Sequence, residues 1–177
     1  KDIKAFYKIG DDLGVDMAIF KSVTQINEAR PEKVIDKLRE SLGVLAGKTI
    51  AIWGLSFKPE TDDVRESPSI SLVEKLLDEK TMVRLHDPES SDNFASLFPV
   101  GENIAYHESP EEAATSAHAV VIATEWGQYR EVDFANLYKS MSRPLILDVR
   151  NMLDAQKIID MGFLYRGTGR YSSSDTT

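Results

Sequence analysis

Residues 49–54 (TIAIWG) decide the fold class, because they form a short, unbroken apolar run that ends at a glycine. Further runs of this kind follow along the chain, at residues 82–87 (MVRLHD), 119–123 (AVVIA), 145–148 (LILD) and 163–165 (FLY). Segments with helical periodicity separate them, at residues 67–77, 111–116, 134–141 and 155–161. Apolar strands that alternate with helices are typical of a parallel sheet that is covered on both faces. We therefore expect an α/β fold with a doubly wound, mostly parallel sheet.

The stretch before residue 49 has a different pattern, and we expect it to be helical. Apolar residues recur at helical spacing from Ile3 to Ile9, and again from Ile19 to Leu42. Pro31 interrupts the second series, so it either kinks one long helix or occupies the first turn of a new one. The expected architecture is thus a Rossmann-like sheet that is preceded by a helical segment.

On this pattern the chain divides into three parts. Residues 1–46 form the helical part, residues 47–170 form the sheet domain, and residues 171–177, rich in Ser and Thr, are expected to be a disordered tail. The helical part carries a longer apolar stripe than a small domain needs. The stripe serves either a subunit interface, which would make the protein a homodimer, or packing against its own domain, and the pattern alone leaves both open.

Composition and charge argue against several classes of function. A net charge of −8 is unsuited to nonspecific binding of nucleic acid, which needs clustered Lys and Arg. No apolar run approaches the roughly 20 residues that span a bilayer. No signal-peptide pattern opens the chain, so we expect a cytoplasmic protein without membrane contact. There is no cysteine, and His86, His107 and His118 are scattered, so we expect no disulfide, no thiol nucleophile and no metal site.

A doubly wound sheet binds its ligands beyond the carboxyl ends of its strands. The first strand runs into a long loop, residues 54–68 (GLSFKPETDDVRESP), where a dinucleotide-binding sheet would carry G-x-G-x-x-G. Only Gly54 is present, so we expect no dinucleotide to be held there in the usual way. Lys58 suits a point-charge contact to a phosphate or sugar hydroxyl, and Arg65 suits a planar, bidentate one. The alternative is a solvated loop with local ion pairs.

Two later strand ends carry further candidates. Arg150 follows residues 145–148, which places it at the ligand-binding rim, unless it forms a salt bridge with Asp148 or Asp154. We interpret Trp126, which follows residues 119–123, as a lid over the strand end and not as a stacking platform. The candidate site is therefore the carboxyl edge of the sheet, with Arg150 as a third cation.

Several motifs at these strand ends resemble one family of enzymes. Residues 57–68 (FKPETDDVRESP) resemble the F-K-x-x-T-x-D-x-R-E-S segment of the NAD-dependent UDP-sugar 6-dehydrogenases, within the UDP-glucose/GDP-mannose dehydrogenase family. Residues 117–126 (AHAVVIATEW) resemble a strand of that family, residues 148–154 (DVRNMLD) its D-x-R-x-x-L-D element, and residues 162–163 and 167–170 its ending. The matches cover nearly the whole chain in the right order. They imply the C-terminal part of such an enzyme, which comprises connecting helices and a UDP-sugar-binding domain.

The start of the chain fits the same resemblance. The catalytic cysteine of the family lies in a C-F-P-K-D stretch, and Lys1 and Asp2 resemble the last two residues of it. A chain that begins with Lys1 and lacks cysteine is thus expected to be a fragment without the nucleophile and without the NAD-binding domain. The resemblance implies that Asp2 helps to activate water, with Lys1 beside it. We expect the fragment to be inactive alone.

The resemblance also implies an activity. Enzymes of this family oxidise the C6 alcohol of the sugar to a carboxylate by two hydride transfers to NAD, with a covalent cysteine intermediate. It implies that Phe57, Lys58 and Arg150 contact the UDP-sugar, that Arg65 reaches NAD, and that the protein dimerises through its long connecting helix. NAD would be bound mainly by the missing N-terminal domain. The overall match leans to the conversion of UDP-glucose to UDP-glucuronate.

Other interpretations stay open. The chain could be a stand-alone, non-catalytic nucleotide-binding or regulatory domain, or a fragment of a UDP-N-acetylmannosamine or GDP-mannose dehydrogenase. A receiver-type signalling domain is disfavoured, because it needs acids directly after its first and third strands. Those positions hold Ser56, Phe57 and Lys58 in one case, and Thr124 and Glu125 in the other.

Overall fold

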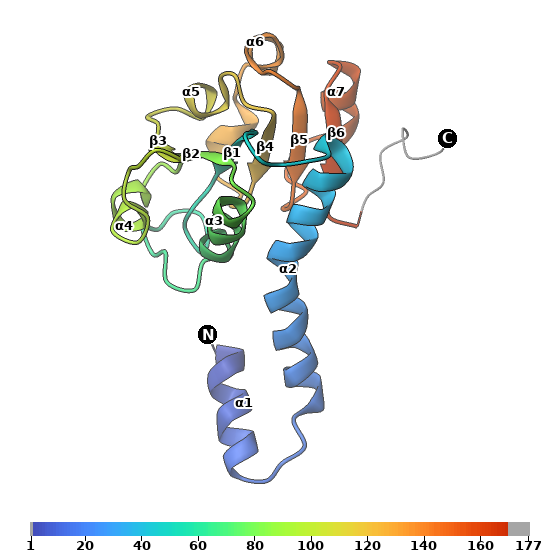
Figure 1. Cartoon of the computed structure of the whole chain (residues 1–177). Helices are drawn as coiled ribbons and strands as arrows, with labels where there is room; N and C mark the ends of the chain where they lie inside the picture. The colour runs from blue at the N-terminus through green and yellow to red at the C-terminus, as the bar shows by residue number, and fades with distance from the viewer. Residues whose placement is uncertain (1, 170–177) are drawn as a thin grey trace.

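The computed structural model describes residues 2–169, and their side chains from Phe6 onward. The described part consists of an α/β domain and a helical hairpin, α1 (Asp2–Asp12) and α2 (Ala18–Leu42), which precedes the domain in sequence. Figure 1 shows the hairpin (blue) extending away from the sheet, while the second half of α2 runs back to the domain. The rings of Phe6 and Phe20 lie with their centroids 5.1 Å apart, so apolar side chains connect the two helices.

Six strands form one parallel sheet in the order β3-β2-β1-β4-β5-β6. The strands are β1 (Thr49–Trp53), β2 (Met82–His86), β3 (Ile104–Tyr106), β4 (Ala119–Ile122), β5 (Leu145–Asp148) and β6 (Leu164–Gly167). The order reverses between β1 and β4, which makes this a doubly wound sheet with its topological switch point between those strands. The expected Rossmann-like α/β fold, preceded by a helical segment, is confirmed.

Helices cover both faces of the sheet and enclose two apolar cores (Figure 1). Besides the second half of α2, they are α3 (Pro68–Asp78), α4 (Ser91–Ala95), α5 (Pro110–Ala114), the 3-10 helix η1 (Gly127–Arg130), α6 (Phe134–Ser140) and α7 (Ala155–Asp160). One core includes Ile35, Leu38 and Phe94 from α2 and α4, and the other includes Trp53 and Tyr129. Trp53 is fully buried. Among the described residues, no helix has both the length and the apolar character that a membrane span needs.

Local chemistry explains where α3 begins, and packing explains why α2 is continuous. The Ser67 hydroxyl accepts a hydrogen bond from the Ser69 N–H at 3.2 Å, and Pro68 occupies the first turn of α3, as its fixed φ favours. Pro31 lies buried inside α2, which runs through it as one helix of 25 residues. Packing holds the helix on both sides of the proline, since Ile35 enters the domain core and Phe20 contacts α1. Pro31 therefore does not start a new helix.

Three short elements are not predicted from the sequence, namely β3, α4 and η1. β3 has only three residues and lies at the edge of the sheet, where Ala105 and Tyr106 remain partly exposed. An edge position removes the demand for a continuous apolar run, so the pattern typical of a buried strand is missing. The predicted last strand is present as β6, which forms the opposite edge and pairs in parallel with β5.

Candidate functional site

All six strands are parallel, so their carboxyl ends lie on one side of the sheet, and this side is the candidate site. The loops that leave β1, β2, β4 and β5 meet there. Register places Trp53 of β1 between His86 of β2 and Ile122 of β4, and Ile122 beside Asp148 of β5. The residues directly after these strands therefore form the rim of the site.

Gly54 ends β1 in a conformation that only glycine adopts easily, with φ of 96°. A Cβ atom at this position would lie 2.4 Å from the Cβ of Thr124 and 2.5 Å from its backbone nitrogen. The Gly54 N–H donates to the His86 carbonyl at 2.9 Å, and the Gly54 carbonyl accepts from the Ser69 hydroxyl at 2.9 Å. The lone glycine thus allows the close approach of the β1 and β4 ends, and does not form part of a dinucleotide fingerprint.

Asp87, the first residue after β2, lies 4% exposed at the centre of this edge. Its Oδ2 atom accepts the backbone N–H of Leu55 at 2.7 Å and that of Ser56 at 3.1 Å. The same atom accepts the indole N–H of Trp126 at 3.0 Å. One carboxylate oxygen therefore joins the loop after β1 to the loop after β4.

The pKa of Asp87 reflects two opposing effects. Burial raises it, but the backbone N–H groups of Leu55, Glu89, Ser56 and Ser90 stabilise the carboxylate, and the net result is a lowered pKa. The bonds from Glu89 and Ser90 reach Oδ1 at 3.0 and 2.9 Å. Asp87 is therefore a buried, charged carboxylate that is satisfied by donors on every side.

The loop after β1 carries three of the predicted site residues. Phe57 is 49% exposed, and its backbone N–H donates to the Asp63 carbonyl at 2.9 Å. Lys58 is exposed and forms no hydrogen bond or ion pair with any residue that the structure describes. Arg65 is paired with Asp63 through Nε and Nη2, at 2.9 and 2.8 Å, and this hydrogen bonding raises the pKa of Arg65. The loop thus leaves Lys58 unengaged and Arg65 in a local ion pair.

Arg150 lies at the end of β5 and forms a two-point ion pair with Glu125 at the end of β4. Its Nη2 atom lies 2.6 Å from Glu125 Oε1, and its Nε atom donates to Oε2. The hydrogen bond from Arg150 lowers the pKa of Glu125. The side-chain salt bridge to Asp148 or Asp154 that the sequence left open is absent, because Asp148 accepts the Arg150 backbone N–H at 3.0 Å and Asp154 caps α7.

Three buried side chains, those of Trp126, Tyr129 and His86, pack at the carboxyl edge of the sheet. Trp126 is 8% exposed and covers the strand end, which agrees with its interpretation as a lid. His86 Nδ1 lies 3.1 Å from the Tyr129 hydroxyl, and burial lowers the pKa of His86. Among the described residues no cluster of His, Cys, Asp or Glu could hold a metal ion.

The predicted catalytic pair is not placed by the structure. Lys1 lies outside the described residues, and only the backbone of Asp2, the first residue of α1, is described. The edge also contains residues that the sequence analysis did not single out for the site, above all Asp87 and Glu125. Asp87 directly follows an apolar strand, and this position is the signal that could have identified it.

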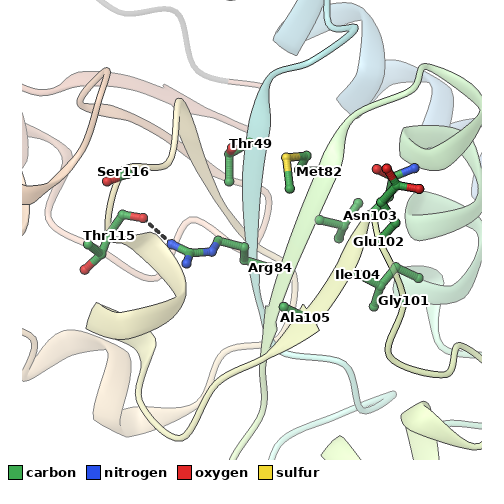
Figure 2. A pocket seen from close by; sticks show the side chains of 11 residues that line it. Thr49, Met82, Arg84, Gly101, Glu102, Asn103, Ile104, Ala105, Thr115 and Ser116 are labelled. Carbon is green, nitrogen blue, oxygen red and sulfur yellow. Dashed lines mark hydrogen bonds between the residues drawn. The ribbon is translucent and has the colours of Figure 1, made fainter.

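A separate hollow of about 330 Å³ lies at the opposite edge, where β1, β2 and β3 begin. Figure 2 shows Arg84 reaching across this hollow to the Thr115 carbonyl at the C-terminal end of α5, to which its Nη1 atom donates. A cation at a helix C-terminus satisfies an orphan carbonyl, which is a common structural role. The hollow contains none of the predicted site residues, so it is distinct from the carboxyl edge.

Comparisons with known proteins agree with the motifs. The family model for the UDP-binding domain of the UDP-glucose/GDP-mannose dehydrogenase family matches residues 51–155. The UDP-glucose 6-dehydrogenase of Pseudomonas aeruginosa is 38% identical over 174 residues, which cover 96% of this chain and 38% of that protein. The UDP-glucose 6-dehydrogenase YwqF of Bacillus subtilis is 35% identical, over 96% of this chain and 38% of that protein. This chain thus spans less than two fifths of the length of these relatives.

Solved structures give the same picture of the fold. A UDP-glucose dehydrogenase from the archaeon Pyrobaculum islandicum superimposes with a TM-score of 0.79 at 33% identity, over 94% of this chain and 35% of that one. A UDP-D-ManNAc dehydrogenase from Pyrococcus horikoshii superimposes with a TM-score of 0.69 at 29% identity, over 88% of this chain and 34% of that one. The likeness therefore includes the helical hairpin as well as the sheet domain.

Proposed function

This chain belongs to the UDP-glucose/GDP-mannose dehydrogenase family and contains the UDP-binding domain of that family. We therefore propose that the carboxyl edge of its sheet binds the UDP part of a UDP-sugar. Phe57, Lys58 and Arg150 are the proposed contacts. The observation that carries this proposal is the placement of Lys58 and Arg150 on loops after β1 and β5, on either side of the β4 end. Cations at this edge hold a diphosphate locally while the chain as a whole stays acidic.

The chemistry of the ligand matches the side chains. Lys58 offers a mobile ammonium with three donors, which suits a phosphate oxygen. Arg150 offers a planar fork, and its two-point pairing with the Glu125 carboxylate supports the same kind of contact to a phosphate. Phe57, half-exposed beside Lys58, supplies an apolar surface for the ligand.

We propose further that the longer protein to which this domain belongs is an NAD-dependent UDP-glucose 6-dehydrogenase that forms UDP-glucuronate in two hydride transfers. The UDP-glucose 6-dehydrogenases at 38% and 35% identity support this choice over the UDP-D-ManNAc dehydrogenase at 29%. The proposed roles of Asp2 in water activation and of Lys1 beside it rest on the resemblance alone. This activity is assigned to the longer protein, not to these residues by themselves.

We propose that the described residues make only a small contribution to the binding of NAD, the hydride acceptor. Gly54 is occupied in packing against Thr124, so the end of β1 is not a dinucleotide cradle. Arg65, with its side chain 75% exposed, is the proposed contact to NAD from this domain. The rest of the longer protein is proposed to bind most of the cofactor.

The hairpin supports a second proposal, that two copies of the chain pair through α1 and α2. Apolar side chains along it are more than half exposed, including Phe6, Ile9, Leu13, Ile19 and Ile26. Exposed apolar side chains gathered on one element mark an interface more often than a free surface. A homodimer would bury them, as the resemblance to dimeric enzymes implies.

Calorimetric titration of the chain with UDP and UDP-glucose tests the binding proposal. Lys58→Ala and Arg150→Ala should each weaken UDP binding by roughly 10- to 150-fold, which is the effect of a charge-assisted hydrogen bond worth about 1.5–3 kcal/mol. Lys139→Ala, which removes an exposed cation from the last turn of α6, is the matched control and should bind UDP normally. If the unaltered chain does not bind UDP, or if the control weakens binding equally, the proposal is wrong.

A further inference from the structure

We propose that Asp87 is the positioning residue of the UDP-binding edge, because its buried carboxylate sets the place of Lys58 relative to the loop after β4. Asp87 is 4% exposed, and its hydrogen bonds go to residues other than Phe57, Lys58 and Arg150. The inference rests on the proposed function, since it assigns a role in the same site.

Three N–H groups from two loops donate to one oxygen atom of Asp87, and this geometry carries the inference. Asp87 Oδ2 accepts the N–H groups of Leu55 and Ser56, the two residues that precede Phe57, at 2.7 and 3.1 Å. It also accepts the indole N–H of Trp126, the residue that follows Glu125, at 3.0 Å. The atom thus lies between the loop that carries Lys58 and the loop whose Glu125 holds Arg150.

Neighbouring bonds restrain the start of the loop further but leave Lys58 itself free. The Thr124 hydroxyl donates to the Ser56 carbonyl at 2.8 Å, so both backbone polar groups of Ser56 are engaged. Phe57 and Lys58, the next two residues, are exposed. The direction in which the backbone leaves Ser56 therefore determines where the Lys58 side chain begins.

Position 87 requires a carboxylate, because five N–H donors point at its side chain. Backbone N–H groups from two loops and one indole N–H point at the two oxygens, and an ionised carboxylate accepts all of them. An asparagine would offer one oxygen and would turn an NH₂ group towards other donors. Asp87→Asn is therefore expected to keep the volume of the side chain while releasing part of the loop.

Calorimetric titration with UDP tests Asp87→Asn and Asp87→Glu, at a temperature where circular dichroism shows both variants folded. Each should bind UDP about tenfold more weakly, because a carboxylate that is lost or shifted displaces the loop. The matched control is Thr81→Val at the other end of β2, where a fully buried hydroxyl donates to the Leu76 carbonyl at 2.8 Å. The control should lose stability and keep its UDP affinity within twofold.

A double-mutant cycle separates positioning from general destabilisation. If Asp87 acts through Lys58, the effect of Asp87→Asn on UDP affinity should fall below threefold in a Lys58→Ala background. An undiminished effect in that background, or normal binding by folded Asp87→Asn, would overturn the inference. Absence of binding by the unaltered chain is a different result, because it refutes the proposed function itself and the role of Asp87 with it.

A readout without substitution covers the case in which neither variant folds. In the unaltered chain, the amides of Leu55 and Ser56 should exchange with solvent deuterium as slowly as those of β1, since buried hydrogen bonds to Asp87 protect them. Exchange at the rate of the exposed loop residues would mean that Asp87 does not restrain this segment, and would overturn the inference.

Discussion

Arg150 and Glu125 form a two-point ion pair across the ends of β5 and β4, with Arg150 Nη2 lying 2.6 Å from Glu125 Oε1. The guanidinium that is proposed to contact UDP is thus held by a carboxylate. A diphosphate has to compete with Glu125 for the same donors, or to use the donors that remain. The pair therefore orients Arg150 and at the same time places a negative charge beside the proposed phosphate position.

Glu125→Gln should strengthen UDP binding by about two- to tenfold. The amide oxygen still accepts a hydrogen bond from Arg150, so the orientation is largely kept, while the charge that repels a phosphate is removed. Calorimetry at two salt concentrations checks this, because the gain should shrink as salt screens the charge. Weaker binding by Glu125→Gln would instead mean that the full ion pair is needed to orient Arg150.

Arg150→Lys should recover little of the affinity that Arg150→Ala loses. Lysine keeps the charge, but an ammonium cannot reproduce two parallel N–H bonds from a planar fork. UDP affinities of the two variants, measured beside melting temperatures, provide the comparison. Recovery of wild-type affinity by Arg150→Lys would show that only the charge at this position matters.

Gly54→Ala should destabilise the domain by about 3 kcal/mol or more. Its φ of 96° disfavours any side chain, and the added Cβ would overlap Thr124. Gly47→Ala is the control, because Gly47 also has a positive φ, of 72°, but has nothing within 4 Å of an added Cβ. Urea unfolding should show a loss of about 1–2 kcal/mol for the control. Equal losses in the two variants would mean that the approach to Thr124 is easily relieved.

The stability of the domain should decrease as the pH falls below about 6.5, in part through His86. Burial lowers the pKa of His86 in the folded chain below its ordinary value of 6.5, despite the nearby charge of Asp87. Below pH 6.5 the unfolded chain therefore takes up a proton that the folded chain resists, and the free energy of unfolding falls until the pH passes the lowered pKa.

Melting temperatures between pH 7.5 and pH 5 provide the measurement for His86. The decrease should be smaller for His86→Gln than for the unaltered chain, because the variant has no imidazole to titrate at that position. Burial also lowers the pKa values of His107 and His118, so part of the slope should persist. An unchanged slope in His86→Gln would assign the effect to those two residues.

Ile19→Glu combined with Ile26→Glu should convert the proposed dimer into a folded monomer. The two side chains are 77% and 54% exposed on the first half of α2, so charges there would disrupt an interface and leave the domain core intact. Val44→Glu is the control, since Val44 is 78% exposed but lies beyond the end of α2. Sedimentation at micromolar concentration gives the outcome, and a monomeric unaltered chain would contradict the dimer.

The sequence predicts the fold where its signals are local. β1, β4 and β5 are unbroken apolar runs and were placed correctly, and Ser67 and Pro68 marked the start of α3. β3 was missed because an exposed edge strand of three residues carries no such run. Continuity of α2 through Pro31 depends on packing at both ends of the helix, which no local rule contains.

The candidate site likewise has features that the sequence predicts and features that it does not. Lys58 and Arg150 were identified because each follows a strand and falls within a family motif, and their roles in binding remain predictions. The pairing of Arg150 with Glu125 could not be predicted, since the two residues are 25 positions apart and nearer acids compete for the guanidinium. The proposed role of Asp87 likewise depends on three loops that only the folded sheet brings together.

The length of α2 means that a small bend in this helix moves its two ends a long way relative to each other. Its second half is anchored in the core through Ile35 and Leu38, while its first half stands clear of the sheet (Figure 1). Pro31, at the junction, lacks the N–H that would complete the helical bonding. A bend of about 10° there would displace Ala18, about 20 Å away along the axis, by about 3 Å. If a partner holds the hairpin, a bend at Pro31 changes the tilt of the whole sheet domain, so a substitution far from the proposed UDP-binding edge would change how that edge faces its surroundings.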